Sequence, residues 1–464
     1  MTISEPQRPA GRQNLAELIL RRRPDADARE RARAGVLDFL SVVLPVVQNQ
    51  VTDGALLPLR RVYPGHDPQT LALLLGYCGH ALDFDDFHPD FRGHPSTVIL
   101  PALLAFAGQR DAVAPERFLD AYVTGVEMAG RLGLAAGARH YLQGFHSTGT
   151  LGGLAAAAAL ARLIHADAPQ TLNMLGIAAS QAAGLRFQFG SAVKPLHAGL
   201  AARAAVSAAQ LTLAGFAGKH DAALDGFLQT YGGAQSRPEA LCENWGAPWR
   251  IVAPGIEFKP WPTCSGTHSA ADAALALRKQ WRQATGLPFS ALTEDIARIE
   301  VAFPPGGDIA AFVRRPQTGI DARFSLEYVI AQALLEGDLP LTRFDENPVD
   351  RTVAALAARV VRVEDRLAPA DALNPAARFH QVTLWRRSGE RLQSRVTRRQ
   401  TLAAGVDPAE KLQRTLPNAT AAQRQRWIAL SRLETPSALS ELLGVFSDWL
   451  KTAPTTVSAS CRER

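Results

Sequence analysis

Apolar residues recur at helical spacing along most of the first 250 residues of this chain. Glycine and proline separate the periodic windows, and such residues commonly punctuate helices. The pattern predicts one helical block, with helices over residues 14–22, 28–47, 70–85, 95–109, 115–134, 149–164, 168–185 and 197–214. Runs of small residues within these windows, at 152–161 and 198–209, predict helices that pack at close range.

The pattern changes after Trp261, where segments of alternating apolar and polar residues begin. Alternation is typical of half-buried strands, and it predicts strands over residues 296–303, 358–364, 379–385 and 392–398. Helices are expected between them and again at the end of the chain, over residues 269–285, 325–335, 347–357, 408–416, 421–433 and 437–450. We therefore predict a mainly α protein with a large all-helical domain, residues 1–261 and 406–464, and a smaller α+β domain, residues 262–405.

Composition narrows the class of protein. Of the 464 residues, 47% are hydrophobic, and the net charge of +6 is a small difference between 50 basic and 44 acidic residues. The basic clusters at 21–23 and 395–399 are not interleaved with aromatic residues, which argues against nucleic-acid binding. A mild positive bias still suits an anionic substrate.

Cysteine usage and hydropathy bear on location. The four cysteines have neither metal-type spacing nor the density of a disulfide framework, which predicts a reduced, cytoplasmic protein. The first 14 residues are polar and the apolar stretches are interrupted, so neither a signal peptide nor a membrane span is expected. The chain also lacks a Gly-rich phosphate loop, a Gly-x-Ser-x-Gly elbow and a Cys-x-x-Cys pair.

Charge is concentrated in one stretch between two apolar runs, His80-Ala-Leu-Asp-Phe-Asp-Asp-Phe-His88 followed by Gly93-His94-Pro95-Ser96. On a helix, His80, Asp83 and Phe87 share one face. Pro95 suits a first helical position, so His94 is expected near a helix N-terminus, which favours anions. We expect Asp83 and His94 to carry chemistry. The other acidic and imidazole groups are expected to be scaffold, with Asp85 and Asp86 capping helices and His88 and Asp90 in solvent.

Three further segments carry candidate chemistry. His146 lies between Gly144 and Gly149 at the start of an Ala-rich helix. Two interpretations of this segment stay open, a simple capping loop and an anion-binding site. Lys194 precedes a proline and another Ala-rich helix, as either a surface charge or an anion clamp. The segment 259–268 crosses the expected domain junction, where clefts commonly form.

In this order and at these separations, the segments resemble the MmgE/PrpD family, which includes 2-methylcitrate dehydratase, cis-aconitate decarboxylase and iminodisuccinate epimerase. The similar residues are His80 to Asp86 with Gly93 to Ser96, Gly144 to Gly149, Lys194 to Gly199, Lys259 to Asp272, and Phe324 to Ala331. The resemblance implies a smaller domain that acts as a lid, a homodimer and no organic cofactor. By motif it implies proton transfer by Asp83, His94 and His146, and substrate binding by Lys194, His268, Tyr328 and Phe87.

The chain departs from the family pattern at two places. Phe87 stands where the dehydratases and decarboxylases have threonine, and Ser265-Gly266 stands where many members have arginine after the cysteine. Both departures affect the substrate pocket.

We expect dehydration of a small hydroxy-di- or tricarboxylate, started by proton abstraction next to a carboxylate. Epimerisation or decarboxylation of a related acid is the alternative within the family. A metal-dependent hydrolase built on His80, Asp83, His88 and His94 is more remote, because no His-x-x-x-His pair or thiolate supports it. An inactive binding protein is equally remote, and no metal is expected.

Overall fold

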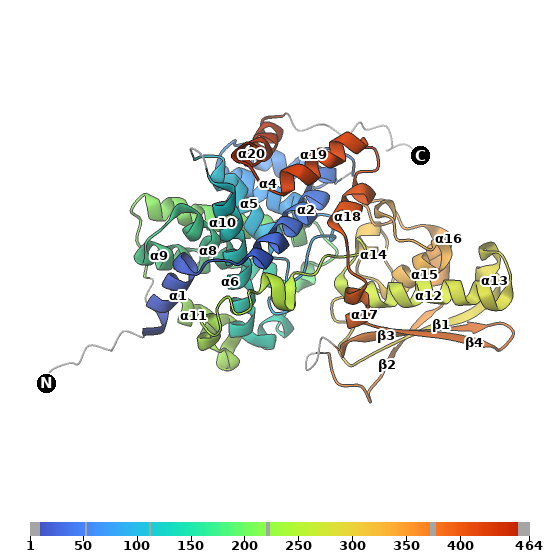
Figure 1. The fold of residues 1–464 in the computed structure, drawn as a ribbon. Helices are drawn as coiled ribbons and strands as arrows, with labels where there is room; N and C mark the ends of the chain where they lie inside the picture. Colours follow the sequence, from blue (N-terminus) through green and yellow to red (C-terminus); the bar gives the residue numbers. More distant parts are fainter. Residues whose placement is uncertain (1–9, 52, 111–112, 220–222, 372–376, 453–464) are drawn as a thin grey trace.

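The computed structural model describes residues 10–51, 53–110, 113–219, 223–371 and 377–452. Figure 1 shows a large helical part, which contains the N-terminal half of the chain, beside a smaller part that contains the sheet. This arrangement confirms the predicted fold class. Within the described residues, no helix combines the length and the apolar character that a membrane crossing requires.

The helical part is built from both ends of the chain around one hydrophobic core, which extends from Leu15 to Phe258 and resumes from Leu412 to Leu450. Its helices are α1 (Ala10–Arg21), α2 (Ala26–Val47), α3 (Leu56–Val62), α4 (Pro68–His80), α5 (Ser96–Ala107), α6 (Pro115–Leu142), α7 (Ser147–Thr150), α8 (Gly152–Ile164), α9 (Ala168–Ala179), α10 (Val193–Leu213), α11 (Ala223–Gly232), α18 (Pro408–Thr415), α19 (Ala421–Ser431) and α20 (Pro436–Lys451).

Polar caps begin several of these helices. The Asp25 side chain accepts a hydrogen bond from the Ala28 amide at the start of α2, and Asp67 does the same for Thr70 at the start of α4. Such caps satisfy amides that have no partner inside the helix.

The smaller part has a separate core, with buried members from Ala270 to Leu384. Its elements are α12 (His268–Thr285), α13 (Leu292–Asp295), β1 (Ile296–Phe303), α14 (Gly319–Ala322), α15 (Leu326–Glu336), α16 (Arg351–Ala357), β2 (Val360–Glu364), β3 (Phe379–Arg386), β4 (Arg391–Thr397) and α17 (Arg398–Ala403). The strand order is β2-β1-β3-β4, with β2 parallel to β1 and the other pairs antiparallel. Two cores agree with two domains, although the limits proposed at 261 and 405 stay predictions.

The strands lie where the alternating pattern predicts them, within about two residues. In β1 the pairing with β3 shifts register between Ile296 and Arg298. The expected helix over 70–85 is wrong at its end. Helix α4 stops at His80, and Asp83 has a left-handed backbone, with φ at +49°.

Helices α4 and α10 approach at glycines. A Cβ atom added to Gly199 would lie 2.3 Å from the Leu73 carbonyl oxygen, and one added to Gly76 would lie 2.8 Å from the Gly199 Cα. This confirms the close packing predicted from the small residues. The contact runs antiparallel, since it brings the C-terminal end of α4, with His80, to the N-terminal end of α10, with Lys194.

Candidate active site

The loop after α4 is buried, and basic side chains from distant segments hold its backbone. Arg323 donates to the Ala81 carbonyl, Lys411 donates to the Phe84 carbonyl, and Lys259 donates to the Asp83 carbonyl at 2.7 Å. Charged donors make strong hydrogen bonds to buried carbonyls. Segments from both parts of the protein therefore fix this loop in place.

Asp83 is the centre of a buried ion-pair cluster. Its Oδ1 accepts hydrogen bonds from Lys194 Nζ at 2.7 Å and from Lys259 Nζ at 2.9 Å. Burial opposes ionisation of this carboxyl, but the two ammonium groups outweigh burial and hold the pKa of Asp83 below its usual range. An ionised carboxylate between two lysines is a counter-ion. The expected helical face shared with His80 is wrong. A carboxylate with so low a pKa is a weak base, and proton transfer by Asp83 stays a prediction.

The lysines themselves are held at fixed positions. Lys194 Nζ also lies 5.3 Å from the centre of the Phe189 ring and 5.5 Å from that of Phe324. Asp83 raises the pKa of Lys259 although burial acts in the opposite direction. Lys259 was not selected from the sequence as a site residue. Two signals could have identified it: its place directly before Pro-Trp-Pro at the domain junction, and its position in a segment that resembles the family.

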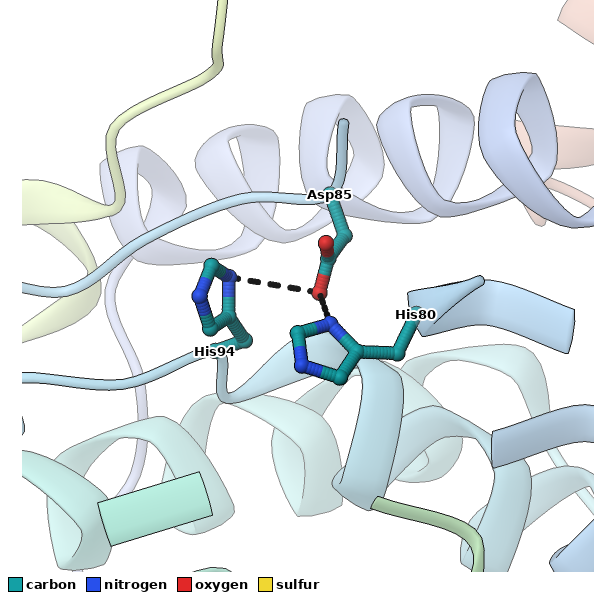
Figure 2. Close-up of side chains that lie close together, drawn as sticks. All are labelled: His80, Asp85 and His94. Carbon is teal, nitrogen blue, oxygen red and sulfur yellow. Dashed lines mark hydrogen bonds and ion pairs between the residues drawn. The ribbon is translucent and has the colours of Figure 1, made fainter. Parts of the chain in front are cut away.

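Figure 2 shows two imidazole rings that converge on one carboxylate oxygen. His80 Nδ1 donates to Asp85 Oδ2 at 2.7 Å, and His94 Nδ1 lies 3.3 Å from the same oxygen. His94 Nδ1 also lies 2.7 Å from the Asp86 carbonyl oxygen. A carbonyl oxygen only accepts hydrogen bonds, so His94 Nδ1 must carry a proton. In the neutral ring, Nε2 is then left with a lone pair.

The electrostatics of this group favour neutral imidazoles on an ionised carboxylate. Burial lowers the pKa of His80 to about 3 and also lowers the pKa of His94. Burial would raise the pKa of Asp85, but the two neighbouring imidazoles outweigh it and hold that pKa well below the usual value. Asp85 therefore orients two histidines, and its expected role as a helix cap is wrong.

Of the other residues that were expected to be scaffold, Asp86 agrees with the prediction and His88 does not. Asp86 accepts from the Ser96 amide at 3.3 Å, at the start of α5, which agrees with a capping role. Burial and the charge of Asp38 raise the pKa of Asp86 to about 8. His88 is completely buried, with Nε2 3.0 Å from the Arg250 carbonyl, so its expected exposure to solvent is wrong. Asp90 is half-buried and pairs with Arg250 at 2.9 Å.

His146 completes the histidine group. It precedes the short helix α7 and is buried, and its ring stacks on that of His80 with 5.7 Å between centres. Its Nδ1 lies 3.1 Å from His197 Nδ1, whereas its Nε2 has no hydrogen-bond partner among the described residues. Burial holds the pKa of His146 well below its usual value, and the nearby Lys194 ammonium acts in the same direction. In the tautomer in which Nδ1 carries the hydrogen and donates to His197, the unpartnered Nε2 has a lone pair and can accept a proton.

These groups line a cavity of about 130 Å³ that lies between the two parts of the protein. The helical part contributes Asp83, His94, His146 and Lys194, together with the rings of Phe87 and Phe189. The smaller part contributes residues 264–266, 305–307 and 309–310, Phe324, Asp371, Arg378 and Arg398. Five cationic side chains and two carboxylates line it, an excess that attracts small polyanions.

Two predicted substrate-binding residues lie elsewhere. His268 lines a smaller adjacent cavity, which shares Phe87 and Lys259 with the first, and its Nε2 lies 3.0 Å from the Thr263 carbonyl. Tyr328 lies in the core of the smaller part, where its hydroxyl accepts from the Asp350 amide at 3.4 Å. Tyr328 is not among the residues that line the cavity, and its contact with substrate stays a prediction.

His80, Asp85 and His94 also present the atom types of a metal site, with one atom from each within 4.8 Å of the others. The observed geometry is that of hydrogen bonding. The Asp86 carbonyl holds a proton on His94 Nδ1, and a protonated nitrogen cannot be a metal ligand.

Comparison with known proteins agrees with this fold. The MmgE/PrpD N-terminal domain matches residues 13–238, and the MmgE/PrpD C-terminal domain matches residues 261–431. Together they account for most of the sequence, and the chain belongs to the MmgE/PrpD family.

The chain is also similar to three named relatives. Cis-aconitate decarboxylase of Homo sapiens is 32% identical over 295 residues, which are 61% of this chain and 59% of the relative. The Mus musculus enzyme is 30% identical over 307 residues, 64% of this chain and 61% of the relative. The Aspergillus terreus enzyme is 26% identical over 283 residues, 57% of each chain. The matched part spans about three fifths of the length of these relatives.

Proposed function

We propose that this protein is a lyase that acts on a small tricarboxylate without an organic cofactor, and that it releases carbon dioxide. One observation carries the proposal. Two neutral imidazoles, His94 and His146, line a cavity in which Lys194 and Lys259 are fixed on one carboxylate. Lysines bind substrate carboxylates and stabilise negative charge, while imidazoles move protons near neutral pH.

The chemistry follows from these groups. The carbon–carbon bond to the departing carboxylate breaks, and its electron pair moves through an adjacent double bond. The distal carbon then takes a proton from an imidazolium. A bound polyanion raises the pKa of nearby imidazoles, so one of them takes up this proton when the substrate binds. Lys194 and Lys259 stabilise the intermediate negative charge through a retained carboxylate.

Two further observations favour decarboxylation over the dehydration expected from the motifs. The named relatives are cis-aconitate decarboxylases. In addition, the rings of Phe189 and Phe324 form an apolar part of the cavity wall. A carboxylate held against such a wall is poorly solvated, and release of neutral carbon dioxide relieves this cost.

Dehydration stays a second candidate, because the lowered pKa values of His94 and His146 suit proton abstraction from a hydroxy acid. Product analysis separates the candidates. The full-length protein is incubated with cis-aconitate, citrate, 2-methylcitrate and malate, and the products are followed by proton NMR and by carbon dioxide release. Loss of carbon dioxide from cis-aconitate supports the first proposal. Loss of water supports the second, and deuterium uptake alone indicates epimerisation.

Variants then test the residues. His94→Gln and His146→Gln should each lower kcat by a factor of about 100 or more, since general acid–base groups typically contribute 10²–10⁴. His66→Gln is the matched control, because His66 is exposed in the loop before α4. Activity like that of the wild type in both cavity variants would contradict the assignment.

A further inference from the structure

The cations of the cavity fall into two groups with different counter-ions. Lys194 and Lys259 share Asp83. Arg378 instead pairs with Asp371, and Arg92 lines the same cavity. Arg92, Arg378 and Asp371 are also electrostatic neighbours, since the charges of the latter two act on the Arg92 guanidinium. The cavity therefore holds a second cationic group besides the lysines.

Arg92 is held in the cavity wall without a counter-ion. It lies in a tight loop closed by pairing of His88 with Gly93, and its φ of +51° is a conformation that side chains other than glycine rarely adopt. The residue is only partly exposed, and no hydrogen bond or ion pair of its guanidinium is found in the described part of the chain. A partly buried, unpaired cation is costly, and a bound anion would offset that cost.

Arg378 is oriented in advance, and its Nη1 has no hydrogen-bond partner among the described residues. Its Nε and Nη2 donate to the two oxygens of Asp371, each at 2.6 Å. Its Nη1 lies 3.8 Å from the place that a Cβ of Gly266 would occupy, in the wall of the cavity. Glycine at position 266 leaves this nitrogen uncovered. Arg378 thus presents free donors without losing its fixed position.

We propose that Arg92 and Arg378 form a second carboxylate subsite, which takes a substrate carboxylate other than the one bound by Lys194 and Lys259. The subsite would select acids with at least two retained carboxylates and would orient the chain of the substrate between the two cationic groups. This inference takes only one thing from the proposed function, namely that the ligand is a small polycarboxylate.

Equilibrium binding tests the subsite without turnover. Isothermal titration of the full-length protein compares tricarballylate with methylsuccinate, which is the same acid without one terminal carboxylate. The wild-type protein should bind tricarballylate at least about 10-fold more tightly, the usual effect of one charge-assisted contact. Arg92→Gln should reduce this preference to about threefold or less and leave methylsuccinate binding nearly unchanged.

Two further variants make the result specific. Arg378→Lys keeps a positive charge beside Asp371 but loses the planar guanidinium and its paired hydrogen bonds. It should also reduce the preference for tricarballylate over methylsuccinate. Arg315→Gln removes an exposed arginine outside the cavity and should leave the preference intact. The inference would be overturned if Arg92→Gln weakened the binding of both ligands equally, or if it changed the binding of neither. A protein that discriminates these ligands but does not convert cis-aconitate would retain the subsite and lose only the proposed reaction.

Discussion

Replacing Asp83 by asparagine should reveal how much the buried ion-pair cluster contributes to stability. Two unit charges about 3 Å apart attract by about 6 kcal/mol at an effective dielectric constant near 20, and Asp83 has two such partners at 2.7 and 2.9 Å. Burial of the ions offsets most of this attraction. Removal of one partner from a buried pair typically costs about 3–5 kcal/mol, because the remaining charge is left uncompensated.

We therefore expect Asp83→Asn to lower the free energy of unfolding by about 3–5 kcal/mol at pH 7. Urea unfolding, followed by circular dichroism, measures this change. The double variant Asp83→Asn/Lys194→Met should be more stable than Asp83→Asn alone, because it leaves one buried cation fewer without a partner. Asp448→Asn is the control, since its ion pair with Lys451 is exposed and contributes little.

The pH dependence supplies a further check on this cluster. The pKa of Asp83 is depressed in the folded protein, so its contribution is present above the unfolded pKa of about 3.9 and is lost as the pH falls. The deficit of Asp83→Asn should therefore shrink below about pH 4. Equal stability of wild type and Asp83→Asn at pH 7 would refute the reasoning.

Four other outcomes are expected. The folded protein binds a proton at Asp86 up to a pKa of about 8, so stability should fall by up to about 5 kcal/mol between pH 4 and 8, and Asp86→Asn should flatten this dependence in urea titrations. Gly199→Ala should destabilise by about 3 kcal/mol or more in thermal unfolding, because its methyl group would meet the Leu73 carbonyl at 2.3 Å. Phe189→Thr should lower the kcat of decarboxylation about 10-fold, since a polar group replaces part of the apolar cavity wall. Light scattering should show a dimer, as the family resemblance implies.

Each of these has its own control. A wild-type protein that is equally stable at pH 5 and pH 8 would contradict the assignment to Asp86. Gly444→Ala should be neutral or stabilising, because a Cβ atom added at this helical glycine would meet no neighbouring group of the described residues within 4 Å. Equal effects of the substitutions at Gly444 and Gly199 would count against the close-packing argument. Phe216→Thr, at an exposed position, should leave kcat unchanged. A monomer at micromolar concentration would refute the dimer.

Periodicity predicted most of the fold because burial repeats with the geometry of each element. The apolar spacing located α2, α8 and α12 to within a few residues, and alternation located the four strands. The prediction from periodicity failed where tertiary contacts replace helical hydrogen bonds. Residues 81–85 continue an acceptable helical pattern, yet Arg323 and Lys411 bind their carbonyls, and the chain turns at Asp83.

The sequence by itself determined which residue types were available to the candidate site, because the order of its motifs singled out Asp83, His94, His146 and Lys194. It also determined the two-part architecture, since local periodicity reports burial directly. Only the tertiary structure decided the protonation states, because those depend on charges that are distant in sequence. Lys259 lies 176 positions from Asp83 along the chain and makes that carboxylate a counter-ion. Burial, in contrast, keeps His94 neutral, and the carbonyl of Asp86 holds its proton on Nδ1, which leaves Nε2 with a lone pair.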